Sequence, residues 1–237
     1  MGYKIKTEKL LLALQQTVKV IPTRSTKPIL GCALFNFSDS LKISASNQET
    51  SINTNIEIDS KDKNEIVAIP IGRLLEITSN LKDNELEFIL LGNNKVEIKT
   101  SNGSFSITGQ DYQEFPPDPI MNESTSISLN MESLIEIIDF TKNSVSKDDL
   151  KPALQGVLFK IDSSQILGVS TDGHRLSRII IKNENDQTKE HEIIIPLKFL
   201  TLLNSFIDKK DKIELEISEN YISVSHKKQT MLLRSSQ

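Results

Sequence analysis

An internal repeat constrains this chain more than any other feature of its sequence. The residues Lys27, Pro28, Leu30, Leu34 and Phe35 reappear in the same order and spacing as Lys151, Pro152, Leu154, Leu158 and Phe159. Further along, the stretch 69–81 reappears as 195–207. A repeat of this length is a whole domain rather than a short solenoid unit. The sequence therefore predicts two domains of one fold.

The composition is typical of a soluble globular protein. The chain has 237 residues, of which 37% are hydrophobic and 25% are charged, so each copy is long enough to bury its own core. No apolar run approaches the roughly 20 residues that a membrane-spanning helix needs. The N-terminus lacks the apolar core of a signal peptide, so we expect a cytoplasmic protein. The single cysteine, Cys32, lies in an apolar run and is expected to be a small buried residue.

Each copy is expected to contain the same order of elements. Apolar residues at helical spacing, and an Ile-Pro pair before each second helix, predict helices over 9–20, 72–81, 131–143 and 197–207. Strands are expected over 31–37, 41–45, 52–58, 66–69, 86–90, 95–100 and 104–108, and over 154–161, 166–170, 175–181, 193–195, 213–217, 221–226 and 230–233. Gly92-Asn93-Asn94 and Glu219-Asn220 are expected hairpin turns. The predicted fold class is α+β, with two helices per domain packed on antiparallel sheets of short strands.

A proline-rich segment separates the two copies. Phe115-Pro116-Pro117-Asp118-Pro119 favours extended, semi-rigid backbone. We therefore expect a first domain over 1–115, a linker over 116–120 and a second domain over 121–237.

The two copies also help to separate structural from functional positions. Positions that keep their character in both copies are explained by the fold, and positions that differ are candidates for function. The largest difference falls at one turn, where the first copy reads Ser46-Asn47-Gln48-Glu49-Thr50 and the second reads Ser170-Thr171-Asp172-Gly173-His174-Arg175-Leu176. Only Asp172-Gly173 is ordinary hairpin chemistry.

This turn, with Lys151-Pro152-Ala153-Leu154-Gln155-Gly156-Val157-Leu158-Phe159 before it, resembles the bacterial sliding-clamp family, the beta subunit of DNA polymerase III. Arg24, the run Pro28-Ile29-Leu30-Gly31 and the pair Phe115-Pro116 match the same pattern in order. The resemblance implies tandem DNA-clamp-fold domains in a non-catalytic subunit without a cofactor. It also implies a ring that encircles duplex DNA and tethers the polymerase. In the family two subunits of three domains form the ring, and this sequence matches the first two domains.

The charge of the chain is compatible with a ring. The chain has 28 basic and 32 acidic residues, whereas proteins that bind DNA through phosphate neutralisation are basic. A sliding ring needs only a modest positive lining, because every tight phosphate contact hinders movement. Some candidate DNA-binding residues are matched by the resemblance, and others are placed by the expected helices and loops. The candidates are Arg24, Lys27, Arg73, Lys147, Lys151 and Lys198. For the helix lysines, a solvated surface charge is an equal alternative.

The resemblance further implies a pocket for a short peptide from DNA polymerase III, the clamp loader and repair proteins. The matching residues of this chain are Leu154, Thr171, Gly173, His174, Arg175 and Leu176. Apolar Leu154 and Leu176 could bury a partner's Leu or Phe, while His174 and Arg175 offer hydrogen bonds at the rim. In the family the rest of this pocket belongs to the third domain.

Three alternatives remain open for this turn. Asp172 and His174 could be an acid–base pair, but no nucleophile motif accompanies them. His174, His191 and His226 could bind a metal, but they are scattered without ligand spacing. The turn could also serve only as a rigid shape.

The missing third domain affects the expected assembly. Ile77, Phe105 and Ile107 match the first-domain side of the family's subunit interface, with ordinary core or edge-strand residues as the alternative. We expect the chain alone neither to close the usual dimer ring nor to bind partner peptides tightly. A ring of three two-domain chains, or a scaffold of clamp domains that forms no ring, are the other hypotheses.

Overall fold

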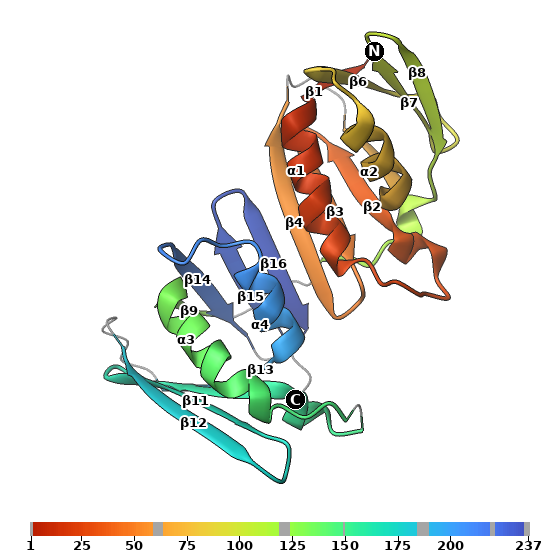
Figure 1. Ribbon diagram of the computed structural model, residues 1–237. Coiled ribbons are helices and arrows are strands. Elements are labelled where there is room, and N and C mark those ends of the chain that lie inside the picture. Colours follow the sequence, from red (N-terminus) through yellow and green to blue (C-terminus); the bar gives the residue numbers. More distant parts are fainter. Residues whose placement is uncertain are drawn as a thin grey trace. The chain divides into compact units, whose positions relative to one another are not determined.

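The computed structural model describes residues 2–58, 64–118, 124–148, 150–183, 190–218 and 221–234. The chain forms two compact units: unit 1 contains Met1–Pro119 and Lys227–Met231, and unit 2 contains Ile120–His226 and Leu232–Gln237 (Figure 1). Lys227–Met231, which the sequence assigned to the second domain, thus belongs to unit 1. The expected turn at Glu219-Asn220 and part of the expected linker 116–120 lie outside the described residues.

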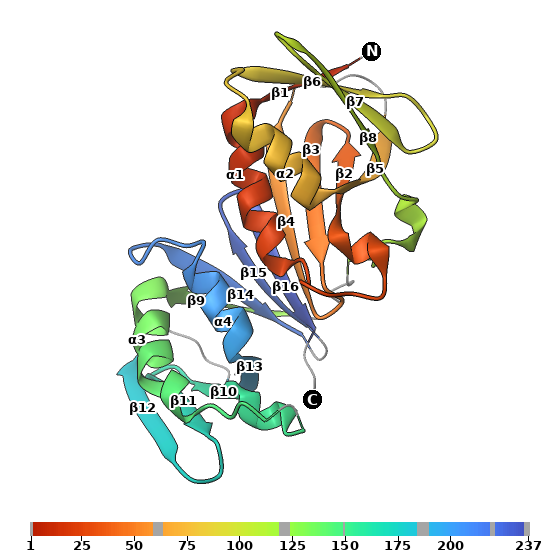
Figure 2. The ribbon, with the colours of Figure 1, turned by 45° about the vertical axis from the view of Figure 1, so that its right-hand side comes forward.

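Unit 1 contains the antiparallel strands β5-β2-β3-β4 of one sheet and a second, four-stranded antiparallel sheet of the order β1-β6-β7-β8. Helices α1 and α2 lie side by side on one face of the first sheet (Figures 1 and 2). The elements are β1 (Tyr3–Lys6), α1 (Thr7–Thr17), η1 (Val18–Val20), η2 (Pro28–Gly31), β2 (Cys32–Phe37), β3 (Ser40–Ser46), β4 (Thr50–Glu57), β5 (Glu65–Pro70), α2 (Ile71–Asn80), β6 (Glu85–Leu90), β7 (Lys95–Thr100), β8 (Gly103–Thr108) and η3 (Tyr112–Glu114).

Unit 2 repeats this plan. One antiparallel sheet has the order β12-β11-β10-β13, a second contains β15-β14-β9, and α3 packs against α4, β11 and β12. Its elements are β9 (Thr125–Asn130), α3 (Met131–Thr141), η4 (Lys142–Ser144), η5 (Pro152–Gln155), β10 (Gly156–Ile161), β11 (Gln165–Thr171), β12 (Leu176–Lys182), β13 (His191–Pro196), α4 (Leu197–Asn204), β14 (Lys212–Ile217) and β15 (Tyr221–His226). Strand β16 (Gln229–Arg234) is divided between the units.

The predicted α+β class is confirmed, and the repeat extends to details of packing. Thr17 at the end of α1 and its equivalent Thr141 at the end of α3 each donate a hydroxyl hydrogen bond to the carbonyl four residues earlier, as Ser and Thr do where they lie within helices, and Thr78 of α2 and Thr201 of α4 make the same kind of bond at non-equivalent positions. The four bonds run from Thr17 to Ala13 (2.8 Å), Thr78 to Leu74 (2.8 Å), Thr141 to Ile137 (2.6 Å) and Thr201 to Leu197 (2.8 Å). The core of unit 1 adds an aromatic cluster in which Tyr3 stacks on Phe37 with ring centroids 4.4 Å apart.

Several element boundaries differ from the prediction. Strands β1 and β9 were not predicted, although each alternates buried and more exposed residues. Leu154 and Gln155 lie in the 3-10 turn η5 rather than in a strand, because Pro152 starts a helical turn. Helix α4 ends at Asn204 instead of residue 207. As expected, Cys32 is buried, and this burial raises the pKa of its thiol to about 11. Over the described ranges, no helix has the length and apolar character to cross a membrane.

Candidate functional site

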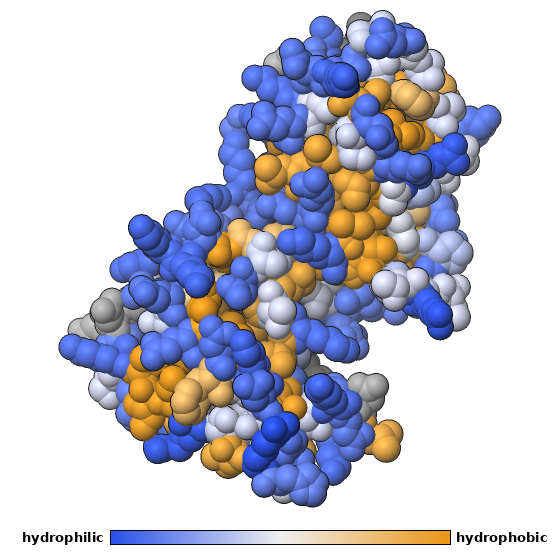
Figure 3. Space-filling view, viewed as in Figure 1, coloured by the Kyte–Doolittle hydropathy of each residue, from blue (hydrophilic) through white to orange (hydrophobic). Residues whose placement is uncertain are grey.

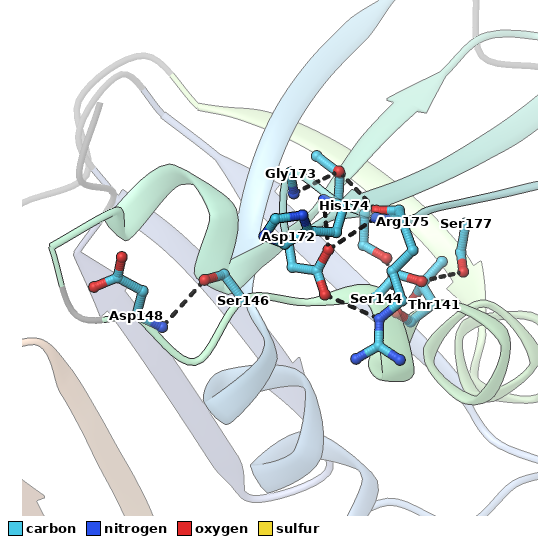
Figure 4. A network of polar contacts seen from close by, with 11 residues as sticks. Thr141, Ser144, Ser146, Asp148, Asp172, Gly173, His174, Arg175 and Ser177 are labelled. Carbon is cyan, nitrogen blue, oxygen red and sulfur yellow. Dashed lines mark hydrogen bonds and ion pairs between the residues drawn. The ribbon is translucent and has the colours of Figure 1, made fainter.

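The turn between β11 and β12 is built around the carboxylate of Asp172. Its Oδ1 accepts hydrogen bonds from the backbone N–H groups of His174 and Arg175, both at 3.0 Å. Its Oδ2 accepts from Nε of Arg175 at 2.9 Å (Figure 4). Gly173 adopts φ +91, a left-handed conformation that glycine tolerates without strain. A short side chain that accepts backbone hydrogen bonds, followed by glycine, therefore determines the shape of this turn.

These bonds also settle the charge of Asp172. The backbone N–H of Arg175, followed by that of His174, lowers the pKa of Asp172 from 3.8 to about 2. The carboxylate is thus ionised at neutral pH, and it bonds to the backbone of His174 rather than to the imidazole. This geometry gives no support to an Asp172–His174 acid–base pair, whose carboxylate would have to orient the imidazole. It fits the alternative of a rigidly shaped turn.

The strands at the base of the turn are bonded to the end of α3. Ser170 Oγ donates to the carbonyl of Thr141 at 2.7 Å, and the hydroxyls of Ser144 and Ser177 lie 2.7 Å apart (Figure 4). These supporting residues were missed from sequence, because an isolated serine or threonine gives no signal of a partner 29 or 33 positions away. The turn is therefore held by a helix as well as by its own hydrogen bonds.

The equivalent turn of unit 1 has the same backbone construction. Asn47 Oδ1 accepts from the N–H groups of Glu49 (3.0 Å) and Thr50 (2.7 Å), as Asp172 does in unit 2. Gln48 takes φ +79 in the place of Gly173. The N–H of residue 48 bonds to Ser46 Oγ at 3.1 Å, as that of residue 173 bonds to Thr171 Oγ1 at 3.1 Å. The two turns therefore share one backbone construction, although their sequences differ.

What differs is the set of side chains that the turn presents. Strand register places Ser46 opposite Ser51 in unit 1 and Thr171 opposite Leu176 in unit 2. Leu176 is 63% exposed, and the Arg175 side chain is 65% exposed. At the equivalent place of Arg175, Thr50 is buried. The turn of unit 2 therefore offers an exposed leucine and guanidinium that unit 1 lacks.

Leu154 lies at the same end of this sheet as the turn. Strand β10 begins at Gly156, just after Leu154, and runs antiparallel to β11 with Leu158 opposite Val169. The start of β10 and the end of β11 at Thr171 therefore lie at one edge. Leu154 is half-buried, and its carbonyl accepts from the N–H of Ser146 at 2.8 Å. The predicted peptide-site residues of unit 2 thus gather at one end of the β12-β11-β10-β13 sheet.

The six predicted DNA-binding residues are all exposed. Two of them, Lys147 and Lys198, line one cavity of about 480 Å³ at the start of α4, where Val145, Pro196 and Leu197 supply apolar walls. Lys151 Nζ lies 4.0 Å from Asp148, which is the limit of an ion pair. Arg24, Lys27 and Arg73 lie in unit 1. On the side of unit 1 where α1 and α2 lie, apolar side chains are mixed with hydrophilic ones (Figure 3).

The three predicted interface residues have different environments. Phe105 on β8 is 40% exposed, Ile77 on α2 is half-buried, and Ile107 is 2% exposed inside the core of unit 1. The core alternative therefore fits Ile107, and Phe105 has the most free surface of the three. Within the described ranges, no group of three or more His, Cys, Asp or Glu side chains could hold a metal ion.

Comparison with known proteins gives one family throughout. The family model "DNA polymerase III beta subunit, N-terminal domain" matches residues 1–119, and "DNA polymerase III beta subunit, central domain" matches residues 128–234. The beta sliding clamp of Bacillus subtilis is 26% identical over 231 residues, covering 94% of this chain and 61% of the relative. That of Haemophilus influenzae is 26% identical over 233 residues, covering 98% and 63%.

A solved structure agrees with the fold. The DNA polymerase sliding clamp from Bacillus subtilis has a TM-score of 0.93 to this chain at 23% identity, covering 100% of this chain and 65% of the other. The chain thus spans 61% to 65% of the length of the relatives that it matches. With both family models matched in order along nearly all of its length, the chain belongs to the DNA polymerase III beta-subunit family.

Proposed function

We propose that this chain supplies two of the domains of a sliding clamp, a processivity factor that encircles duplex DNA and tethers the replicative polymerase. The observation that carries the proposal is the ordered match to the N-terminal and central domains of the beta subunit. The chain spans 61% of the length of the Bacillus subtilis relative, so the ring function of the whole clamp is a proposal for these two units. The chain has no catalytic role of its own and works in the cytoplasm.

The exposed cations support weak, mobile contact with DNA. Arg24, Lys27, Arg73, Lys147, Lys151 and Lys198 all face solvent, while the net charge of the chain is −4. Dispersed cations on a slightly acidic protein are more typical of a ring that slides along DNA than of a protein that binds phosphates tightly. Phe105, and Ile77 more weakly, remain the candidates for the subunit contact of unit 1.

Light scattering tests the assembly. We expect residues 1–237 measured by themselves to have a particle mass below that of a closed dimer ring, because the family resemblance implies three domains per subunit. A stable dimer that stays on nicked circular DNA and leaves when the circle is cut would overturn this expectation. A stable trimer would favour a ring of three two-domain chains, and equal retention on circular and linear DNA would favour a scaffold that forms no ring.

The turn of unit 2 supports a second part of the proposal, a dock for the short peptides of DNA polymerase III, the clamp loader and repair proteins. Leu154 and Leu176 provide apolar contact, Thr171 and Gly173 provide the shape, and His174 and Arg175 provide exposed donors. A buried Leu or Phe of a partner beside a directed donor is the usual chemistry of peptide recognition.

A labelled peptide of the Gln-Leu-x-Leu-Phe type tests this dock. Leu176→Asp and Arg175→Ala should each weaken binding by about tenfold, since anchor residues of small interfaces carry 1–2 kcal/mol or more. The matched controls are Ser51→Asp and Thr50→Ala, which change the equivalent positions of unit 1 and should leave binding unchanged. An equal loss of peptide binding in the unit 1 variants and the unit 2 variants would contradict the proposed dock. Affinity as high as that of a three-domain clamp would instead contradict the expectation that this chain alone does not bind partner peptides tightly.

A further inference from the structure

Three serines beneath the unit 2 turn join one rung of its sheet to the end of α3. Ser170 and Ser177 are opposite each other in the β11–β12 pair. Ser170 Oγ donates to the carbonyl of Thr141 at 2.7 Å, and Ser177 Oγ lies 2.7 Å from Oγ of Ser144 (Figure 4). Ser144 and Ser170 are buried. We call Ser144, Ser170 and Ser177 the serine bridge.

The serine bridge lies directly beneath residues of the proposed dock. Thr171 is opposite Leu176 in the next rung of the same pair of strands. Successive strand residues face opposite sides of a sheet, so Ser170 and Ser177 face α3 whereas Leu176 faces the other side. The bridge thus holds the base of the strand end that presents the exposed leucine.

The segment that carries one side of the bridge also holds Leu154. The 3-10 turn η4 ends at Ser144, and two residues later the N–H of Ser146 donates to the carbonyl of Leu154 at 2.8 Å. Residues 141–146 are therefore bonded both to the rung beneath Leu176 and to the turn that contains Leu154. These two leucines are the apolar residues of the proposed dock.

Unit 1 builds the same place without hydroxyl groups. The opposed pair at this rung of β3 and β4 is Ala45 and Ile52, and η1 ends at Val20 instead of a serine. All three residues are buried. Pro22 corresponds to Ser146 in the repeat and has no N–H to donate. The fold therefore does not require these polar groups.

Apolar residues are the simpler choice at a buried position, because a buried hydroxyl must replace its lost hydration by hydrogen bonds. Each hydroxyl of the serine bridge has such a partner, at 2.7 Å. A buried polar network whose groups are all satisfied makes a structure rigid and selects one arrangement, whereas apolar contacts are not directional. Unit 2 thus has a fixed arrangement where unit 1 has apolar packing, and unit 2 is the unit with the exposed leucine and guanidinium.

We propose that Ser144, Ser170 and Ser177 are positioning residues that set the separation of Leu154 and Leu176. They thereby set the spacing of the apolar side chains that the dock accepts from a partner peptide. This inference rests on the proposed peptide dock and deepens it, because it assigns peptide selectivity to residues behind the exposed wall. Fixing the two leucines before binding reduces the conformational entropy that binding must remove.

Replacement by the residues of unit 1 tests the bridge in the whole chain. Ser170→Ala and the double variant Ser144→Val/Ser177→Ile should each weaken binding of a fluorescent Gln-Leu-x-Leu-Phe peptide by about three- to tenfold, because a preorganised site loses affinity when it is loosened. The peptide Gln-Leu-x-x-Leu-Phe, with one residue inserted, should lose less, so the ratio of the two affinities should fall towards one. The melting temperature of the double variant should be nearly unchanged, because apolar residues replace both partners of a hydrogen bond.

Two single variants are the controls. Ser177→Thr keeps the hydroxyl, and unit 1 accommodates a β-branched residue at this place, so affinity and selectivity should both be retained. Ser205→Ala removes a hydroxyl bond of the same length, 2.7 Å, to the carbonyl of Leu202 at the end of α4. This variant should change neither the affinity nor the ratio of the two peptides.

Unchanged affinity and selectivity in the folded bridge variants would overturn the proposal. A loss of affinity that Ser205→Ala or Ser177→Thr shares would also overturn it, because the loss would then not depend on the bridge hydroxyls. If the unchanged chain binds neither peptide, the dock itself is contradicted, and hydrogen exchange tests the bridge alone. The N–H of Ser146 should exchange faster in Ser144→Val/Ser177→Ile, because residues 141–146 lose their bond to β12. Equal exchange would show that the serine bridge does not hold the segment bonded to Leu154.

Discussion

At the residue scale, Asp172 and Asn47 show how one acceptor determines a turn in both copies of the repeat. Each side chain receives two backbone N–H groups, and the following residue takes a positive φ whether it is Gly173 or Gln48. The shape of the turn therefore belongs to the fold. Recognition must come from the exposed side chains, of which Arg175 and Leu176 have no counterpart of the same chemistry in unit 1.

Replacement of Asp172 by Asn should keep the turn and remove a source of acid sensitivity. The pKa of Asp172 is about 2 in the folded chain, below its ordinary 3.8, so the carboxylate stabilises the fold above the ordinary value and loses that contribution as pH falls towards 2. The urea concentration at the midpoint of unfolding should therefore decrease less between about pH 4 and pH 2 in Asp172→Asn than in the unchanged chain.

Asp172→Ala provides the contrast, since it removes the acceptor altogether. Hydrogen exchange at the N–H groups of His174 and Arg175 should become faster in Asp172→Ala than in Asp172→Asn. Equal exchange in the two variants would show that the strands, rather than the side chain, hold this turn. Asp162, whose pKa is also lowered to about 2 by Ser164, is the matched acid control outside the site.

At the element scale, the outer face of each sheet contains a pair of residues whose sizes compensate. In unit 1, Cys32 lies on β2, which pairs with β5, the strand of Ala68. In unit 2, Gly156 lies on β10, which pairs with β13, the strand of Ile194. A Cβ on Gly156 would lie 2.6 Å from Cγ2 of Ile194. The larger side chain of β13 therefore occupies the space that the smaller one of β10 leaves.

Gly156→Ala should lower the free energy of unfolding by about 1–3 kcal/mol, which is the usual cost of overpacking. Adding Ile194→Ala should recover part of the loss, because it removes the nearest clash but not the Ile195 carbonyl at 2.8 Å. Denaturant titration of the two single variants and the double variant measures the coupling. Gly31→Ala, where nothing lies within 4 Å of the added Cβ, is the control and should leave stability nearly unchanged. Strictly additive losses would contradict this account.

Sequence reasoning was most accurate for the elements with strong periodicity. The helices and most strands were predicted close to their observed bounds, because their apolar residues repeat in both copies. Strand β1 was missed because Tyr3 and Ile5 alone carry its alternation. The equivalence of the two turns was missed because Gln48 gives no sign of a positive φ. The segment from Phe115 to Asp118 was interpreted only as part of a linker, since nothing local to Phe115 indicates which strands it covers.

At the scale of the whole molecule, each unit has its own core, and the repeat makes each a control for the other. Phe115 is the feature that unit 1 has and the described part of unit 2 lacks. If Phe115 holds residues 110–118 against β2 and β5 of unit 1, loss of its ring should affect that sheet and leave the β12-β11-β10-β13 sheet of unit 2 as it was. This separates a local packing role from a general loss of stability.

Phe115→Ala should therefore speed hydrogen exchange in β2 and β5, whose residues Cys32, Leu34 and Ala68 belong to the same hydrophobic cluster as Phe115. Removing a buried phenyl ring costs about 3 kcal/mol or more, so the protection of these strands should fall by about a hundredfold, at 1.4 kcal/mol per factor of ten. The equivalent strands β10 and β13 should keep their exchange rates. Uniform acceleration in both units would mean that Phe115 stabilises the chain as a whole. No change in β2 and β5 would mean that the bonds of Gln110 to Ala68 and of Asp118 to Lys42 and Asn53 suffice to hold residues 110–118 on this sheet.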